Sequence, residues 1–242
     1  MRIRVFDTPH DAGIYTAAQV EQVILEMDDP VLGLATGSTP IPLYQSLVTL
    51  YQSGLDFSRA VTINLDEYIG IPSSHKESYR FFMQQQLFER TNIAPRNINF
   101  PDGMAADLGA ECARYDEVLK QYPIDLQILG VGVNGHIGFN EPDDLLKSKT
   151  HVVNLRPETV KSNARFFDRM EDVPKQAITM GVQAILQARK IILMAFGMEK
   201  AEIVAKAIRG EVRTDVPASI LLLHPDVTVV LDVESASRLS EG

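Results

Sequence analysis

Residues 124–142 read IDLQILGVGVNGHIGFNEP, and they place a short apolar run directly before a glycine-rich loop. The run at 124–129 is typical of a buried strand, and the loop at 130–142 holds four glycines together with His136 and Glu141. Glycine is common where the backbone takes a positive φ or passes close to a ligand. Histidine and carboxylate groups transfer or steer protons near neutral pH. We therefore expect a strand that leads into the floor of a binding pocket.

Outward from this segment, apolar runs of strand length alternate with helical patterns along most of the chain. This alternation predicts a mostly parallel central sheet covered by helices on both faces, which is a three-layer α/β/α sandwich. No repeat, low-complexity tract or linker is visible, so we expect a single domain over residues 1–242. The predicted strands are 3–6, 31–35, 61–65, 124–129, 151–155, 190–196 and 227–232, and the predicted helices are 11–27, 41–50, 78–89, 106–120, 157–164, 174–188 and 197–209.

The composition is that of an ordinary globular protein with an acidic surface. The 242 residues are 45% hydrophobic and carry a net charge of −9, which argues against a nucleic-acid partner because phosphate contacts need clustered Lys and Arg. Cys112 is the only cysteine, so no intrachain disulfide can form. The segment 1–7 has no apolar core of signal-peptide length, and no apolar run approaches about eighteen residues. We expect a cytoplasmic protein without a membrane partner.

Residues 36–40, TGSTP, lie between a predicted strand and a predicted helix. Small residues around Gly37 leave backbone N–H groups free to face an anion at the start of the helix, and Ser38 and Thr39 add hydroxyl donors. The segment matches neither of the glycine-rich nucleotide motifs. A tight turn with a capping hydroxyl is the simpler alternative for this stretch alone.

Asp66 and Glu67 follow the strand predicted at 61–65. Neighbouring strand residues point to opposite faces, so at most one of the two carboxylates faces a given pocket wall. An aspartate at this place can act as a general base if burial raises its pKa from about 3.9. We keep both residues as candidates, Asp66 for catalysis and Glu67 for substrate binding, and a solvated or capping acidic pair is the alternative.

The loop at 130–142 combines His136 and Glu141 with Asn134. A carboxylate that reaches the imidazole would orient it and favour its charged form, which makes a proton shuttle. No further His or Cys stands nearby at metal-ligand spacing, so we expect no metal. A purely structural loop is the alternative.

Arg165 and Lys200 are candidate partners for a substrate phosphate. Lys200 falls near the start of a predicted helix, where a cation opposes the helix dipole and a bound anion would offset it. For each residue alone, a solvated surface charge is the simpler reading. The segment 154–172 is a candidate lid, because Arg165 must reach inward from it.

Several of these segments, in the same order, give the chain a resemblance to the glucosamine-6-phosphate deaminase family. The segments are LGLATGSTP, NLDEYIG, ESYRFFM, NGHIGFNEP, SNARFFD, AITMGV and FGMEKA, and they span nearly the whole sequence. The resemblance implies a Rossmann-like fold and the conversion of D-glucosamine 6-phosphate and water to D-fructose 6-phosphate and ammonia, in amino-sugar catabolism.

The same resemblance implies roles for individual residues. His136, assisted by Glu141, opens the pyranose ring, and Asp66 takes the C2 proton and delivers it to C1. No metal or organic cofactor is required. The positions that match the family's phosphate-binding residues are Gly37, Ser38, Thr39, Arg165 and Lys200.

The chain departs from the family pattern at two places. Many members have aspartate where this chain has Asn134, which cannot ionise and must therefore act by hydrogen bonding or orientation. Hexameric, allosteric members carry a basic pair where this chain has His151 and Val153, and they have a longer C-terminal extension. We expect activity to survive, no activation by N-acetylglucosamine 6-phosphate, and a monomer or low-order homo-oligomer.

Two other functions stay open at this point. A 6-phosphogluconolactonase-like hydrolase shares the superfamily scaffold but has little use for an enolising base at Asp66. A sugar-phosphate-sensing effector domain needs a DNA-binding segment, whereas the chain enters a predicted strand at residues 3–6, and its acidic charge also disfavours this reading.

Overall fold

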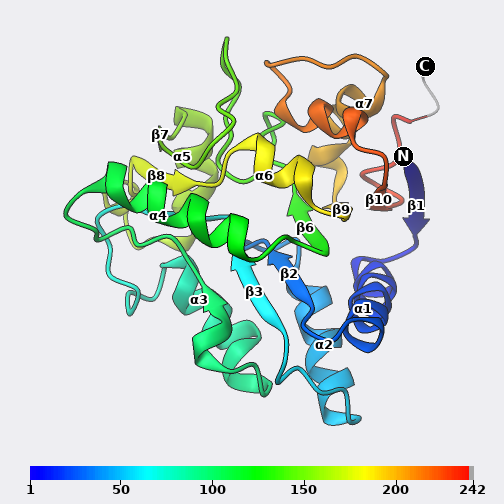
Figure 1. The fold of residues 1–242 in the computed structure, drawn as a ribbon. Coiled ribbons are helices and arrows are strands. Elements are labelled where there is room, and N and C mark those ends of the chain that lie inside the picture. Colours follow the sequence, from blue (N-terminus) through cyan, green and yellow to red (C-terminus); the bar gives the residue numbers. More distant parts are fainter. Residues whose placement is uncertain (240–242) are drawn as a thin grey trace.

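Seven parallel strands form the central sheet, in the order β1-β10-β9-β6-β2-β3-β5 (Figure 1). The structure is a computed structural model, and it describes residues 1–239. β2, β3 and β6 run side by side through the middle of the molecule. The strands of this sheet are β1 (Arg2–Phe6), β2 (Val31–Leu34), β3 (Val61–Asn64), β5 (Ile98–Asn99), β6 (Leu126–Gly130), β9 (Lys190–Ala195) and β10 (Val227–Asp232).

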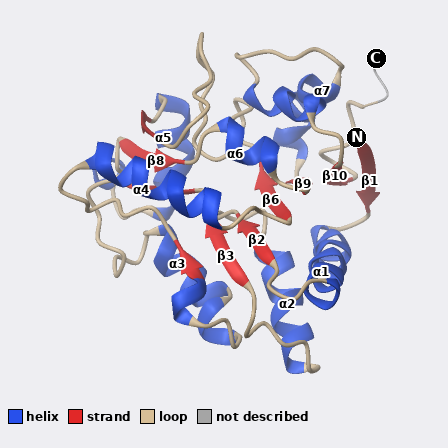
Figure 2. Ribbon diagram, viewed as in Figure 1, coloured by secondary structure: helices blue, strands red, loops and turns tan. Residues whose placement is uncertain are grey.

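Helices cover both faces of the sheet, which confirms the three-layer sandwich (Figures 1 and 2). Alternate strand residues enter opposite cores: Val31 packs with residues of α4, α6 and α7, whereas Leu32 packs with residues of α1, α2 and α3. The helices are α1 (Pro9–Glu26), α2 (Ile41–Gln52), α3 (Tyr79–Gln86), α4 (Leu108–Gln121), α5 (Pro157–Asn163), α6 (Val182–Gln187) and α7 (Ala201–Ile208).

Local sequence explains where two of the longer helices begin. Thr8 caps α1 by accepting a hydrogen bond from the backbone N–H of Asp11, and proline follows it at the first helical position. Asp107 caps α4 and accepts from the backbone N–H groups of Gly109 and Ala110. The sequence analysis predicted both helices to within two residues at each end.

A second, antiparallel sheet of three strands, in the order β4-β8-β7, was not predicted. It is built from β4 (Asp66–Tyr68), β8 (Gln176–Thr179) and β7 (His151–Asn154), and it pairs Asp66 with Thr179. Only Leu65 separates β3 from β4, so this small sheet branches directly off the central one.

The helix predicted at 174–188 is wrong. Its first part is strand β8, and only Val182–Gln187 forms a helix, α6 (Figure 2). Ala177, Ile178 and Thr179 are all buried, so β8 lacks the alternation of a half-exposed strand, and a short apolar run of this kind looks the same in a strand and a helix. The boundary is at Gly181, where an added Cβ would lie 2.2 Å from the Ser148 carbonyl oxygen.

Short 3₁₀ turns link several elements. The turns are Phe88–Arg90, Pro95–Asn97, Ala164–Phe166, Met170–Asp172, Met198–Lys200 and Pro217–Leu223.

Among residues 1–239, no helix is both long and apolar enough to cross a membrane.

Candidate active site

A cavity of about 150 Å³ lies where β2, β3, β6 and β9 end. The carboxyl edge of a parallel sheet is the expected place for a ligand. The walls are the loops that follow these strands, the start of α3, and the segment that contains α5. Seven of the ten residues singled out in the sequence line the cavity: Gly37, Ser38, Thr39, Asp66, His136, Arg165 and Lys200.

One side of the cavity has the features of an anion site. Gly37 lies in the left-handed region, with φ of 93°, and α2 begins shortly after it. The Arg165 guanidinium donates to the Ser38 hydroxyl at 3.2 Å, and the Lys200 ammonium donates to the Val131 carbonyl at 2.8 Å. Within residues 1–239, neither cation has an ion-pair partner at salt-bridge distance. Two positive charges therefore meet a loop at a helix start, and no carboxylate of the described residues pairs with them directly.

Lys200 is the more buried of these two cations, and its environment favours an incoming anion. Burial lowers the pKa of the Lys200 ammonium, the Glu199 carboxylate opposes this effect, and the Arg165 charge adds to it. A bound anion would relieve both the lost hydration and the repulsion between the two cations.

Asp66 is the buried carboxylate of the cavity, with 5% of its surface exposed. Burial raises its pKa well above the usual range, the neighbouring Glu67 charge adds to the rise, and a hydrogen bond from the Phe139 N–H opposes it. A raised pKa makes the carboxylate a stronger base. The structure thus gives Asp66 the property that the sequence analysis required of a general base.

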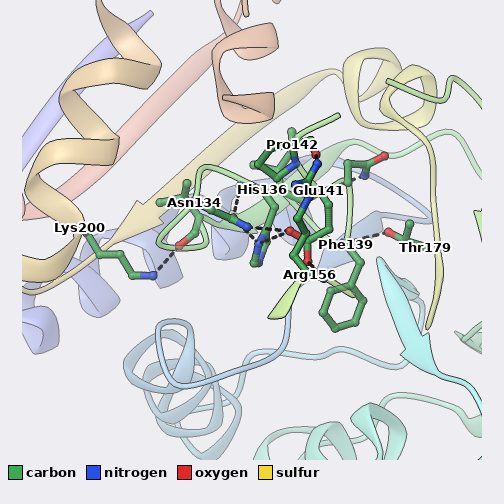
Figure 3. Close-up of polar contacts among 11 residues, drawn as sticks. Asn134, His136, Phe139, Glu141, Pro142, Arg156, Thr179 and Lys200 are labelled. Carbon is green, nitrogen blue, oxygen red and sulfur yellow. Dashed lines mark hydrogen bonds and ion pairs between the residues drawn. The ribbon is translucent and has the colours of Figure 1, made fainter. Parts of the chain in front are cut away.

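His136, Asn134 and Glu141 form one hydrogen-bonded group (Figure 3). The Asn134 amide N–H donates to Glu141 Oε2 at 2.8 Å, and Asn134 Oδ1 lies 2.8 Å from His136 Nδ1. Because an ionised carboxylate only accepts, the amide must turn its oxygen toward the imidazole, so His136 Nδ1 carries a proton. Nε2 is then the ring nitrogen left to exchange protons with a substrate.

Glu141 supplies the negative charge behind this histidine. Its Oε2 lies 3.5 Å from His136 Nδ1, and its Oε1 accepts from the Arg156 backbone N–H at 3.3 Å (Figure 3). Burial raises the pKa of the Glu141 carboxyl, but hydrogen bonding and charge interaction with His136, helped by Asn134, lower it to about 2. Neither Asn134 nor Glu141 lines the cavity, so both would act on a substrate only indirectly, by way of His136.

Two glycines of the loop explain why it is glycine-rich. A Cβ at Gly132 would lie 2.2 Å from Cε1 of the His136 ring, so the ring packs directly over the backbone there. Gly138 has φ of 56°, and a Cβ at this position would lie 3.2 Å from Asp66 Oδ2. The loop therefore touches both the histidine and the aspartate.

Glu67 does not reach this cavity. Its carboxylate accepts hydrogen bonds from the backbone N–H groups of Tyr68, Tyr79 and Arg80, and it lines a different cavity on the other side of β4. The expected substrate contact is absent from this geometry. The rule that adjacent strand residues face opposite ways places Asp66 and Glu67 correctly, with one in each cavity.

Sequence reasoning missed Tyr79 and Asn163 as lining residues. The Asn163 amide donates to the Tyr68 hydroxyl at 2.8 Å, and the Tyr79 hydroxyl donates to the same oxygen at 3.3 Å. Both residues lie in segments quoted for the family resemblance, ESYRFFM and SNARFFD, which was the available signal. Among residues 1–239, no group of three or more His, Cys, Asp or Glu side chains is placed to hold a metal ion.

Proton-transfer groups that share one cavity with two cations define an α/β enzyme that acts on a small anionic substrate. Within this class, residues 7–230 match the model for Glucosamine-6-phosphate isomerases/6-phosphogluconolactonase, and the chain belongs to that family.

Individual relatives lie nearer to one branch of the family. The chain is 50% identical over 224 residues to a glucosamine-6-phosphate deaminase of Thermoanaerobacter pseudethanolicus, covering 92% of this chain and 88% of the relative. It is 47% identical over 241 residues to that of Halothermothrix orenii, covering 99% and 100%. A solved monomeric glucosamine-6-phosphate deaminase superposes with a TM-score of 0.96 at 44% identity, covering 98% of this chain and 100% of the other. The 6-phosphogluconolactonase from Trypanosoma brucei, at 19% identity and TM-score 0.78 over 99% and 98%, shares the fold.

Proposed function

We propose that this chain converts D-glucosamine 6-phosphate and water to D-fructose 6-phosphate and ammonia. The observation that carries the proposal is one cavity shared by the buried base Asp66, the His136 relay and the cations Arg165 and Lys200. Identity of 47–50% to relatives named glucosamine-6-phosphate deaminase supports it.

The first chemical step is ring opening at His136. Nε2 takes the proton of the anomeric hydroxyl and returns a proton to the ring oxygen, which breaks the C1–O5 bond and leaves an aldehyde at C1. The Nδ1–H bond to Asn134 keeps the ring in place, and the Glu141 carboxylate stabilises the imidazolium that forms in between.

The second step belongs to Asp66. Its carboxylate removes the C2 proton next to the aldehyde. The electron pair of the C–H bond forms the C1=C2 bond, and O1 takes a proton from the substrate's own ammonium group, which gives an enolamine. Return of the proton to C1 leaves an iminium at C2, which water hydrolyses to the ketone and ammonia. Each of the two proton-transfer groups is worth about 10²- to 10⁴-fold in rate.

The substrate phosphate would lie in the cradle made by the turn at 36–40, Arg165 and Lys200. Helix-start N–H groups and paired cations are a common anion site. We further propose that the segment 154–172 acts as the lid of a single domain, because it carries Arg165 over the cavity to Ser38 and ties Asn163 to Tyr68. The cytoplasmic location stays a prediction.

Ammonia release from glucosamine 6-phosphate tests this function, with Asp66→Asn and His136→Gln variants run beside the wild type. Each variant should lose about 10²- to 10⁴-fold in kcat. A silent wild-type enzyme would defeat the assignment, and a fully active Asp66→Asn variant would place the base elsewhere. Hydrolysis of 6-phosphogluconolactone is the companion assay, in which we expect no comparable rate.

A melting curve separates lost chemistry from lost fold in the Asp66→Asn variant. The fold raises the pKa of this carboxyl, so its ionised form is penalised in the folded state. The penalty is absent at a pH below the unfolded pKa of about 4, grows as the pH rises, and reaches about 1.4 kcal/mol for each unit of pKa shift. At pH 7 the asparagine variant should therefore melt no lower than the wild type.

A further inference from the structure

Glu67 faces away from the substrate cavity, yet it is as deeply buried as the base Asp66. Only 4% of its surface is exposed, and it lines a cavity of about 520 Å³ behind β4. Asp66 and Glu67 are consecutive residues of this three-residue strand. The two carboxylates therefore lie on opposite faces of the same short strand.

The contacts of Glu67 are those of a helix cap supplied from another element. Its Oε1 accepts from the N–H groups of Tyr68 at 2.8 Å and Tyr79 at 2.9 Å, and its Oε2 accepts from Arg80 at 3.0 Å. Tyr79 and Arg80 are the first two residues of α3, whose N–H groups have no partner within the helix. Ser78 caps the same helix at Phe81. The negative charge also suits the positive end of the helix dipole.

This cap fixes a wall of the substrate cavity. Tyr79 is the first residue of α3 and lines the cavity beside Asp66. Its ring stacks on Phe139 with 5.7 Å between centroids, and Phe139 belongs to the loop that carries His136. Glu67 thus joins β4 to the start of α3, and Tyr79 joins α3 to this loop.

The charge of Glu67 also acts on Asp66 directly. After burial, it is the second cause that raises the Asp66 pKa. Burial raises the pKa of Glu67 itself, and its three N–H donors and the Arg80 cation oppose that rise. The other titratable or charged groups that face Asp66 are Tyr68, Tyr79, Tyr115, His136, Arg165 and Lys200. Those that face Glu67 across its own cavity are Arg80, Asp102, Glu111 and Arg114.

We propose that Glu67 is a positioning residue that holds the start of α3 in place and keeps a fixed negative charge directly behind the base Asp66. This inference rests on the proposed function, in which Asp66 removes the C2 proton.

The pH profile of kcat/KM for ammonia release tests the role of the charge. Glu67→Gln keeps one acceptor oxygen for the Tyr68 and Tyr79 N–H groups, but it loses the acceptor for the Arg80 N–H and the negative charge. Asp66 should then become a weaker base. The acid limb should move to lower pH, and kcat on the plateau should fall about 3- to 10-fold. Glu67→Asp keeps the charge on a shorter side chain, so its acid limb should stay near that of the wild type while its melting temperature falls.

Two further variants keep the test decisive. Arg80→Met retains the backbone donor to Glu67 and removes the cation that favours the ionised form of Glu67. Its acid limb should therefore move in the same direction as that of Glu67→Gln, to lower pH. Glu111→Gln is the matched control, because Glu111 is also buried and lines the same cavity but pairs with Arg114 at 2.7 Å. Its acid limb should coincide with that of the wild type.

The inference is overturned if the acid limbs of Glu67→Gln and Arg80→Met both coincide with the wild-type limb. It is also overturned if Glu111→Gln shifts the limb as much as Glu67→Gln does. If Asp66→Asn is inactive while the acid limbs of Glu67→Gln and Arg80→Met coincide with the wild-type limb, only the role of Glu67 is defeated. An active Asp66→Asn variant defeats the proposed base itself.

Discussion

The side-chain amide of Asn134 determines which ring nitrogen of His136 carries the proton and which one is left to face a substrate. Because its N–H₂ group is committed to Glu141, its oxygen is the only group it can offer to Nδ1. An aspartate at this position, as in many family members, would add a second negative charge beside Glu141. Asn134 instead fixes the tautomer without charge and leaves Glu141 alone to balance an imidazolium.

Asn134→Leu should slow ring opening about 10²-fold, because the leucine side chain cannot hold the Nδ1–H bond. The variant should shift the slow step away from C2 deprotonation. Substrate with deuterium at C2 measures this shift, and the isotope effect on kcat/KM should be smaller in the variant than in the wild type.

Asn134→Asp is the matched control for this prediction, since its carboxylate still accepts from Nδ1. It should keep at least about a tenth of the wild-type activity. An unchanged kcat/KM in Asn134→Leu would contradict the orienting role of the amide.

At the level of elements, the central sheet could be predicted from sequence and the small sheet could not. Buried strands such as β2 and β3 stand out because apolar runs end at turns and precede helical patterns. β8 is buried on both faces from Ala177 to Thr179 and is only four residues long, so only its pairing with β4 and β7 distinguishes it from a helix. The same pairing decides which carboxylate of β4 lines the candidate site, so the sequence alone could not tell that Asp66 lies in this cavity and Glu67 in another.

The contact between α5 and β4 predicts a measurable effect on substrate binding. Asn163→Ala removes the hydrogen bond to the Tyr68 hydroxyl, which is worth about 1 kcal/mol, and so favours the open position of the proposed lid. We expect KM to rise about 5-fold with a smaller change in kcat. Steady-state rates at saturating and limiting substrate measure both constants.

Lys161→Ala is the control for this lid experiment, because Lys161 is exposed on the same helix. It should behave as the wild type. If Asn163→Ala lowered kcat and left KM unchanged, Asn163 would act in the chemical step instead of in closure.

For the whole molecule, the question is whether a second ligand site controls the first. A third cavity of about 180 Å³ includes Glu141, His151, Val153 and Arg156. Allosteric members of the family carry a basic pair at the positions of His151 and Val153. Here one member of the pair is an apolar residue, and burial lowers the pKa of His151. The family's basic pair is therefore missing at positions 151 and 153, and the fixed cations of this cavity are Lys147 and Arg156 from other positions.

We predict that N-acetylglucosamine 6-phosphate does not activate the enzyme and that the protein is a monomer or low-order homo-oligomer. Initial rates over a range of substrate, with and without that sugar, should superpose. Light scattering on the eluted protein measures the mass. A clear drop in the substrate half-saturation point would contradict the first statement, and a hexamer would contradict the second.

The contacts of Arg165 and Lys200 with Ser38 and the Val131 carbonyl have a practical consequence. Neutral oxygens accept hydrogen bonds from both cations, so a ligand must displace these bonds, and we expect a doubly charged oxyanion to do so. Inorganic phosphate should compete with the sugar, which makes phosphate buffers unsuitable for assays. In a living cell, the orthophosphate level would set how much amino sugar the enzyme needs before it turns over at half its maximal rate.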